Sequence, residues 1–423
     1  MTTISDILKD IEIPKVMKIK QEFNDKKVDH IEKELYKQFL EKNIKSNIKK
    51  GRKIAITAGS RGISKYKEIM KVTVDFVKEC GGEPFLVPSM GSHGGATGMG
   101  QVKVLNDLGI TEEYIGAKIL SSMDVIEIGK TEKNLPVYID KNAYYSDGII
   151  LLNRIKMHTS FRGKYESGLI KMLAIGLAKR KGADMTHRLR YENMAENIIS
   201  VGKVCIDKLN IIGAVATIEN GYNQVSDIFV LNKYEILEKE PKILEKSKHI
   251  MAKIYLDEID VLIVKEIGKD ISGTGMDTNI VGRFHTNAAS GGPQIIKLGL
   301  LDISEKSDGN ANGMGLADFI SKKLYNKIGF QYTYLNAITS TEPNSVKVPM
   351  VLNSDKEVFQ ACIKLCGKLD ISEIKMVIIE NTKNLNEVFM SEAAFKSISN
   401  KNKVKITSNL INIEFDKDGN CML

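Results

Sequence analysis

The sequence has no tryptophan, and aromatic residues make up only 6% of its 423 residues. Arginine is also scarce, with eight residues, so most of the 61 basic side chains are lysines. Surfaces that bind nucleic acid usually combine cations with aromatic platforms on which bases stack. We therefore attribute the formal net charge of +8 to a lysine-rich solvated surface and expect no nucleic-acid partner.

Long apolar runs are missing as well. None approaches the ~18–20 residues that a membrane span needs, and the first residues lack the basic start and apolar core of a secretory signal. These absences favour a cytoplasmic enzyme or binding protein without a membrane partner. The 43% hydrophobic and 27% charged content is typical of globular proteins, and ~150 residues per domain predicts two or three domains.

Cysteines are few and scattered. The chain has five, an odd number, so no disulfide framework is expected. Cys362 and Cys366 lie four residues apart, on one face of a predicted helix. Because no other cysteine or histidine lies near them in the sequence, we assign them to core packing. A metal site therefore has to be sought among the histidines.

Short apolar strands alternate with glycine-rich turns and helical segments along the chain. A strand over 53–58 runs into the turn Gly59-Ser60-Arg61-Gly62, which precedes a helix over 64–80. The strand over 83–89 is followed by a second glycine-rich turn, residues 91–98. This order predicts an α/β fold, in which the loops at the carboxyl ends of the strands build the sites.

The same pattern continues into a second half. Strands are predicted over 147–156, 211–219, 260–268, 330–338 and 375–381, helices over 168–181 and 239–255, and a hairpin over 403–415. A charged helical segment places the domain boundary near residue 250. We predict two α/β domains, residues 1–250 and 251–423, with the site in the cleft between them.

Three of the six histidines stand at positions suited to chemistry. His93 lies in a glycine-rich turn after a predicted strand, and His158 follows another strand. His187 comes sixteen residues after Lys171. Histidine exchanges protons near neutral pH and is the commonest metal ligand, so these residues are candidates for both roles.

The turn after the first strand has a second interpretation. Residues 57–64 resemble the glycine fingerprint of short-chain dehydrogenases but have Ala58 and Ser64 where that pattern has glycine. The pair Tyr114 and Lys118 has the spacing of that family's Tyr-x-x-x-Lys, yet it lies too close to the turn. Backbone N–H groups of such a turn still bind anions. An NAD(P)-dependent oxidoreductase using Gly59–Ser64 is therefore an alternative, as is a non-catalytic protein that binds an anion or RNA.

Residues 153–188 and the turn around His93 resemble the lactate racemase family of nickel-pincer enzymes. The family has a histidine after a strand, a Ser-Gly-x-x-Lys element, and a second histidine sixteen residues after that lysine. Here these are His158, the run Ser167–Lys171, and His187. The Gly-x-His element corresponds to the turn with His93, and the run Gly275–Asn279 is similar to a loop of the family's second domain.

The resemblance implies a nickel-pincer nucleotide tethered covalently to Lys171. In such a cofactor two sulfurs and one ring carbon hold Ni(II), and His187 would complete a near-planar site, a geometry that suits nickel with soft donors. Ser60, Gly94, Gly168 and Asp277 are expected to bind the cofactor. Cofactor-synthesis enzymes would then be transient partners, and homo-oligomer formation is left open.

The resemblance also implies an isomerase, a 2-hydroxy acid racemase or epimerase. His93 and His158 would flank the substrate and exchange its hydroxyl proton while the C2 hydride moves to the cofactor and back. An enzyme that inverts a centre needs a proton-transfer group for each hand of its substrate. Arg61 would grip the carboxylate through two hydrogen bonds, and Arg162 and Thr278 are further candidates for substrate binding.

Two departures from the lactate enzymes concern the substrate. Ala58 stands where they have an aspartate, and the spacing from His158 to Lys171 is three residues longer. The longer loop contains Thr159, Ser160, Arg162 and Lys164, all hydrogen-bond donors. This favours a larger polar acid, such as a sugar acid or a dicarboxylic hydroxy acid.

Lys171 itself lies among apolar neighbours, Leu169, Ile170, Met172 and Leu173. Helical residues that are apolar almost all round are usually buried, and a buried lysine is costly unless it is neutral or modified. The pattern therefore favours a covalent tether over a surface lysine.

Overall fold

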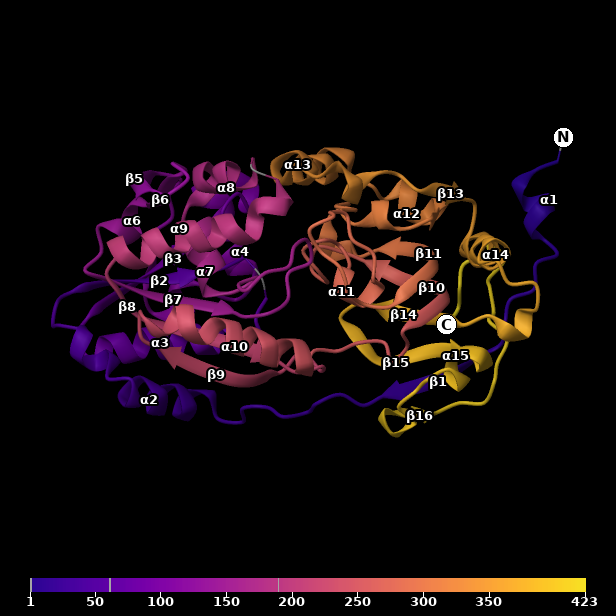
Figure 1. Ribbon diagram of the computed structural model, residues 1–423, viewed down its shortest axis with the longest axis horizontal. Helices are drawn as coiled ribbons and strands as arrows, with labels where there is room; N and C mark the ends of the chain where they lie inside the picture. Colours follow the sequence, from indigo (N-terminus) through magenta and orange to yellow (C-terminus); the bar gives the residue numbers. More distant parts are fainter. Residues whose placement is uncertain (1, 61, 189) are drawn as a thin grey trace. The chain divides into compact units, whose positions relative to one another are not determined.

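The computed structural model describes residues 2–60, 62–188 and 190–423 and divides into two compact units (Figure 1). The central unit is Asp25–Met251, and the terminal unit joins the segment ending at Asn24 to Ala252–Leu423. Both have the α/β architecture predicted from the sequence. The division after Met251 lies one residue from the predicted boundary, but residues 2–24 belong to the terminal unit and not, as predicted, to the N-terminal domain.

The central unit is built on a six-stranded sheet with the order β4-β3-β2-β7-β8-β9. Its strands are β2 (Lys53–Ala58), β3 (Glu83–Pro88), β4 (Lys118–Ile119), β7 (Gly148–Arg154), β8 (Ile211–Glu219) and β9 (Val225–Leu231). Neighbours pair parallel except β9, which is antiparallel to β8. The apolar runs of the inner strands follow from this position, because such strands are covered on both faces.

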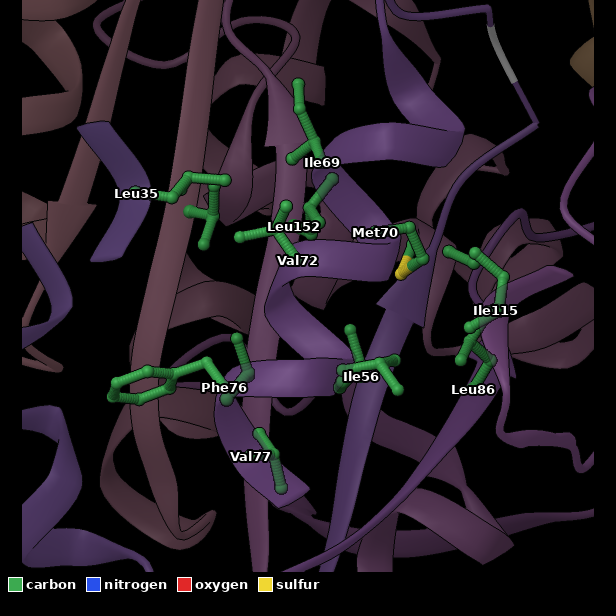
Figure 2. Packing of buried hydrophobic residues seen from close by; sticks show 14 of the residues in the cluster. Leu35, Ile56, Ile69, Met70, Val72, Phe76, Val77, Leu86, Ile115 and Leu152 are labelled. Atoms are coloured by element: carbon green, nitrogen blue, oxygen red, sulfur yellow. The ribbon is translucent and has the colours of Figure 1, made fainter. Parts of the chain in front are cut away.

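One face of this sheet carries a cluster of buried hydrophobic residues, part of which is shown in Figure 2. It is covered by α2 (Ile31–Glu41), α3 (Tyr66–Glu79), α4 (Gly98–Asp107) and α5 (Glu112–Ile115). Buried residues of α3, among them Ile69 and Phe76, pack against Ile56 and Leu152 of the strands. The Phe76 ring stacks on Phe39 of α2 with centroids 4.3 Å apart.

The candidate site is carried by a second group of helices. These are α7 (Leu169–Lys171), α8 (Lys179–His187), α9 (Met194–Lys208) and α10 (Glu235–Ile250), with α6 (Lys141–Tyr144) beside a hairpin of β5 (Val125–Lys130) and β6 (Pro136–Asp140). The helix predicted over 168–181 is broken into α7, a π-helical turn over Met172–Gly176, and α8. The break coincides with a close approach, since a Cβ on Gly176 would lie 2.5 Å from the Ser89 carbonyl oxygen.

The terminal unit has an eight-stranded sheet with the order β13-β12-β11-β10-β14-β15-β1-β16. Its strands are β1 (Val16–Gln21), β10 (Glu258–Ile267), β11 (Gln294–Ile303), β12 (Phe319–Ser321), β13 (Met350–Leu352), β14 (Met376–Asn381), β15 (Asn384–Ser391) and β16 (Val404–Ile406). The strands from β10 to β14 pair parallel, whereas β15, β1 and β16 are antiparallel to their neighbours. β1 thus fills a place between β15 and β16, which explains why the first residues belong to this unit.

Its helices are α1 (Ile4–Leu8), α11 (Thr278–Val281), α12 (Lys322–Asn326), α13 (Phe330–Ser340), α14 (Asp355–Leu365) and α15 (Glu392–Lys396). Leu8 of α1 and Phe359 of α14 belong to a buried cluster with Val261 and Ile263 of β10. In the described part of the chain, none of the helices has the length and apolar character needed to cross a bilayer.

Two predictions for this unit were wrong. The segment predicted as a strand over 330–338 is the helix α13. Its buried residues, Thr333 and Ala337, are four apart, as on one face of a helix, while Tyr332 and Ile338 are exposed. The hairpin predicted over 403–415 is also absent from the described residues, because β16 pairs with β1 instead.

Candidate functional site

The loops that contain the predicted histidines lie at one edge of the central sheet. β3, β2 and β7 are parallel neighbours. His93 lies in the loop after β3, the turn of Gly59 and Ser60 follows β2, and His158 follows β7. Because the carboxyl ends of parallel strands meet at the same edge, these loops are neighbours, as the sequence predicted.

His158 and Lys171 are in direct contact, Nε2 of the imidazole facing Nζ of the amine. The loop fixes the histidine in three ways. Its backbone N–H donates to Glu166 Oε2 (2.7 Å), its Nδ1 accepts the Ser160 N–H (3.0 Å), and its ring packs on Phe161 with centroids 4.3 Å apart. The imidazole is therefore held with Nε2 toward the lysine.

This arrangement determines which atoms carry protons. Since Nδ1 of His158 accepts a backbone N–H, a neutral ring carries its proton on Nε2. Nε2 faces Lys171 Nζ, so the imidazole and the amine lie within hydrogen-bond reach of each other. A lysine amine is the nucleophile that covalent attachment requires, and the structure places it beside this ring.

The segment with Lys171 is anchored by a residue that the sequence analysis missed. Glu240 of α10 is buried, and its Oε2 accepts the Ile170 N–H (3.0 Å). Burial raises the pKa of Glu240 to about 8, against the lowering effect of the backbone N–H groups it accepts from Ile170 and Leu169. Near neutral pH this carboxyl group therefore keeps its proton.

Gly168, predicted to bind the cofactor, has a structural reason to be glycine. A Cβ at this position would lie 2.0 Å from Glu240 Oε1. Glu240 was visible in the sequence as a polar residue at an apolar position, because Ile236, Ile243 and Leu244 of the same helix are buried. Its partner lies 70 residues away in the chain, and no sequence signal indicated the contact.

His187 is the last residue of α8 and is half-buried. Its ring meets the Tyr191 ring edge-on, with centroids 5.7 Å apart. Burial, and then the charge of Lys171, lower the pKa of His187 to about 4. The imidazole is therefore neutral at physiological pH, the form in which histidine binds a metal.

His93 is exposed, in a loop of unusual backbone conformation. Gly91, Gly94 and Gly95 all have positive φ. Gly94, predicted to bind the cofactor, also packs so closely on α4 that a Cβ would lie 2.5 Å from the carbonyl carbon of Gly100. The loop thus depends on glycine for its shape.

Two residues of the central unit, Arg61 and Arg162, were predicted to bind the substrate. Arg162 donates from Nη1 to the carbonyl oxygens of His158 (2.6 Å) and Phe161 (3.1 Å) and lies 3.6 Å from Glu166 Oε2. It therefore braces the His158 loop, and its role in substrate binding stays a prediction. Arg61 lies outside the described residues, and the neighbouring Ser60 is half-buried.

Asp277 and Thr278 lie in the terminal unit, after β10. The Asp277 carboxylate caps α11 by accepting the Asn279 N–H (3.0 Å), and Thr278 is fully buried. Their predicted contacts with cofactor and substrate stay predictions. Within residues 2–60, 62–188 and 190–423, no cluster of three or more His, Cys, Asp or Glu side chains is arranged to hold a metal ion.

A second contact that the sequence analysis missed lies at the same edge of the central sheet. Arg154, the last residue of β7, forms an ion pair with Glu219, the last residue of β8. Glu219 Oε1 also accepts the Ser64 N–H (2.7 Å), so it holds the turn after β2. The sequence signal that could have indicated this contact is a charged residue at the end of each of two apolar strands.

Comparison with known proteins places these residues in a family context. Residues 6–198 match the family described as lactate racemase N-terminal domain, a range that includes His93, His158, Lys171 and His187. A crystal structure of a protein from Thermotoga maritima is similar in fold, with a TM-score of 0.53, 14% identity, and 86% of this chain and 99% of that chain covered.

The lactate racemase apoprotein from Thermoanaerobacterium thermosaccharolyticum aligns with a TM-score of 0.44 and 10% identity, over 87% of this chain and 89% of that chain. A comparison with curated protein sequences found no significant match.

Proposed function

We propose, from the match of residues 6–198 to the family described as lactate racemase N-terminal domain, that the chain is a 2-hydroxy acid racemase or epimerase with a nickel-pincer cofactor tethered to Lys171. The observation that carries the proposal is the contact between Lys171 Nζ and His158 Nε2. It brings the predicted tether and a predicted proton-transfer group together at the edge of the sheet.

The described residues fit the cofactor that the family implies. Lys171 offers an amine for the tether, and His187 offers a neutral imidazole for nickel. When bound, the cofactor would supply the metal and the acceptor for the C2 hydride.

His158 is prepared for proton transfer by the same contacts. Its Nδ1 is engaged with the Ser160 N–H, so only Nε2 remains to exchange a proton with a substrate hydroxyl. A lysine bonded to a thioacid group becomes an amide-like nitrogen, which no longer accepts the Nε2–H. Attachment at Lys171 would therefore release Nε2 of His158 for the substrate.

His93 is the second proton-transfer group in this proposal. It is exposed at the same sheet edge, in the loop after β3, so it is accessible to a substrate. Each histidine would serve one hand of the substrate, removing the hydroxyl proton of one enantiomer and returning it to the other. Arg61 would hold the carboxylate and orient C2.

We propose a polar acid larger than lactate as the substrate. The support is the long His158 loop, in which Lys164 is exposed. The Arg162 guanidinium and the Ser160 backbone N–H already make contacts within the loop. The proposal therefore rests on Lys164 and on the length of the loop.

The alternative of an NAD(P)-dependent oxidoreductase finds less support in the structure. Its anion site would use backbone N–H groups of the turn after β2. The Gly59 N–H already donates to the Tyr66 hydroxyl (2.7 Å), and the Ser64 N–H donates to Glu219. The backbone N–H groups at both ends of the turn thus already donate hydrogen bonds within the protein.

The test is inversion of C2 by protein produced together with the cofactor-synthesis enzymes. Lactate, a dicarboxylic 2-hydroxy acid and an aldonate, each supplied as one stereoisomer, are incubated without NAD(P) and analysed by chiral chromatography. We expect inversion of at least one polar acid, loss of inversion in Lys171→Ala, and retention in Lys203→Ala, which changes an exposed lysine of α9. Nickel-loaded protein that inverts none of them, or inversion only with added NAD(P), would contradict the proposal.

A further inference from the structure

Lys179 is a fully buried lysine that the proposed chemistry does not use. It begins α8, is 0% exposed, and has φ of +53°, in the left-handed region that non-glycine residues rarely occupy. A buried ammonium group is costly unless every proton on it has a partner. The presence of a lysine in this conformation therefore calls for a specific set of contacts.

The ammonium group makes two hydrogen bonds and one ion pair. Nζ donates to the Pro88 carbonyl oxygen (2.5 Å) and to Gln101 Oε1 (3.0 Å), and it lies 3.2 Å from Asp140 Oδ2. Asp140 is also fully buried. These acceptors come from the end of β3, from α4 and from the end of β6, so Lys179 joins three elements at one point.

Gln101 extends this network to the His93 loop. With its Oε1 facing Lys179, its Nε2 donates to the carbonyl oxygens of Gly91 (2.9 Å) and His93 (3.4 Å). The loop also touches the segment between Lys171 and α8 directly, since the Gly91 N–H donates to the Gly176 carbonyl oxygen (3.1 Å). A single buried side chain thus separates Lys179 from the backbone of His93.

We infer that Lys179 is a positioning residue, which through Gln101 holds the His93 loop in place against the segment with Lys171 and His187. Proton transfer requires the histidine within hydrogen-bond distance of the substrate hydroxyl, and a loop with several positive-φ residues does not ensure this alone. The buried network supplies the missing constraint. The catalytic meaning of this inference rests on the proposed function, whereas the placement of the loop does not.

Amide hydrogen exchange on the protein without cofactor tests the placement. Two variants interrupt the network at different points: Lys179→Met removes the cation, and Gln101→Met leaves the Lys179–Asp140 pair intact. Lys203→Met, an exposed lysine of α9, is the control. If Lys179→Met does not fold, Asp140→Asn with Lys179→Met removes both buried charges and avoids an unpaired carboxylate.

We expect exchange over residues 89–97 to accelerate ~10–100-fold in both network variants, as expected for loss of hydrogen bonds to a charged group. Exchange in β8 should not change, and Lys203→Met should match the parent. Unchanged exchange over 89–97, or acceleration of equal size across the whole central unit, would overturn the inference. This result does not depend on nickel, so it is distinguishable from failure of the proposed function.

In the loaded enzyme Gln101→Met separates positioning from general stability. We expect kcat to fall at least ~10-fold, with KM and the nickel content unchanged, because the histidine is displaced while cofactor and carboxylate sites remain. Loss of nickel in parallel with kcat, or an unchanged kcat, would contradict a role in positioning His93.

Discussion

Glu240 makes the stability of the protein depend on pH in a direction that can be predicted from its burial. Its pKa rises from the usual 4.5 to about 8 in the folded chain, because burial disfavours the charged form. Between these values the unfolded chain has released the proton while the folded chain keeps it. Stability must therefore fall as pH rises through this interval, and it levels off above about pH 8.

The size of this effect follows from proton linkage. Each pH unit in the interval lowers the free energy of unfolding by about 1.4 kcal/mol. Across the whole interval the contribution of this one carboxyl group reaches about 5 kcal/mol as an upper limit. Gln has nearly the same shape as a protonated Glu, still offers an oxygen to the Ile170 N–H, and does not titrate.

The assay compares Glu240→Gln with the parent by urea unfolding at pH 5, 7 and 9, followed by far-UV circular dichroism. We expect nearly equal stability at pH 5 and a variant that is more stable at pH 9, since the titrations of all other groups cancel in the difference. A difference that does not change with pH would refute the assignment of a neutral Glu240.

Three further predictions concern packing and the histidines. Gly168→Ala should lower the free energy of unfolding by about 1–3 kcal/mol or more in a urea titration, because its Cβ would meet Glu240 Oε1 at 2.0 Å. The control Gly62→Ala, whose nearest contact would be at 4.0 Å, should leave the free energy of unfolding almost unchanged. Phe76→Ala should cost about 3–5 kcal/mol in the same assay, since the ring is buried and stacked on Phe39. In loaded protein, His158→Ala should keep nickel in metal analysis but lose ~10²–10⁴-fold in kcat; an undiminished rate would exclude it as a proton-transfer group.

Several inner strands, among them β7, β8, β10 and β14, could be predicted because they lie between two covered faces, whereas the inner strand β11 was missed. β7 and β8 are continuous apolar runs, which indicate such strands without any knowledge of their partners. The short strands β12 and β13 and the place of β1 beside β15 are set by long-range pairing, so no local pattern indicated them. In α13 the local signal was misleading, because Tyr332 and Tyr334 are exposed side chains of a helix.

The candidate site, like the fold, could be predicted only in part from the sequence. That the loops of His93 and His158 lie at one edge of the sheet could be predicted from the sequence, since each loop follows a strand of a parallel sheet. The residues that hold these loops in place could not be predicted. Glu240 meets the Lys171 segment and Lys179 meets Gln101 across long stretches of chain, and each contact depends on packing that only the folded chain brings about.

The tether at Lys171 is the central claim, and intact mass combined with metal analysis tests it most directly. The protein is produced with the cofactor-synthesis enzymes, alongside Lys171→Ala and a lactate racemase as a positive control for loading. We predict an added mass that maps to the peptide with Lys171, with nickel bound in proportion to it, and neither in the variant. An unmodified chain without nickel, from cells in which the control is loaded, would contradict the claim.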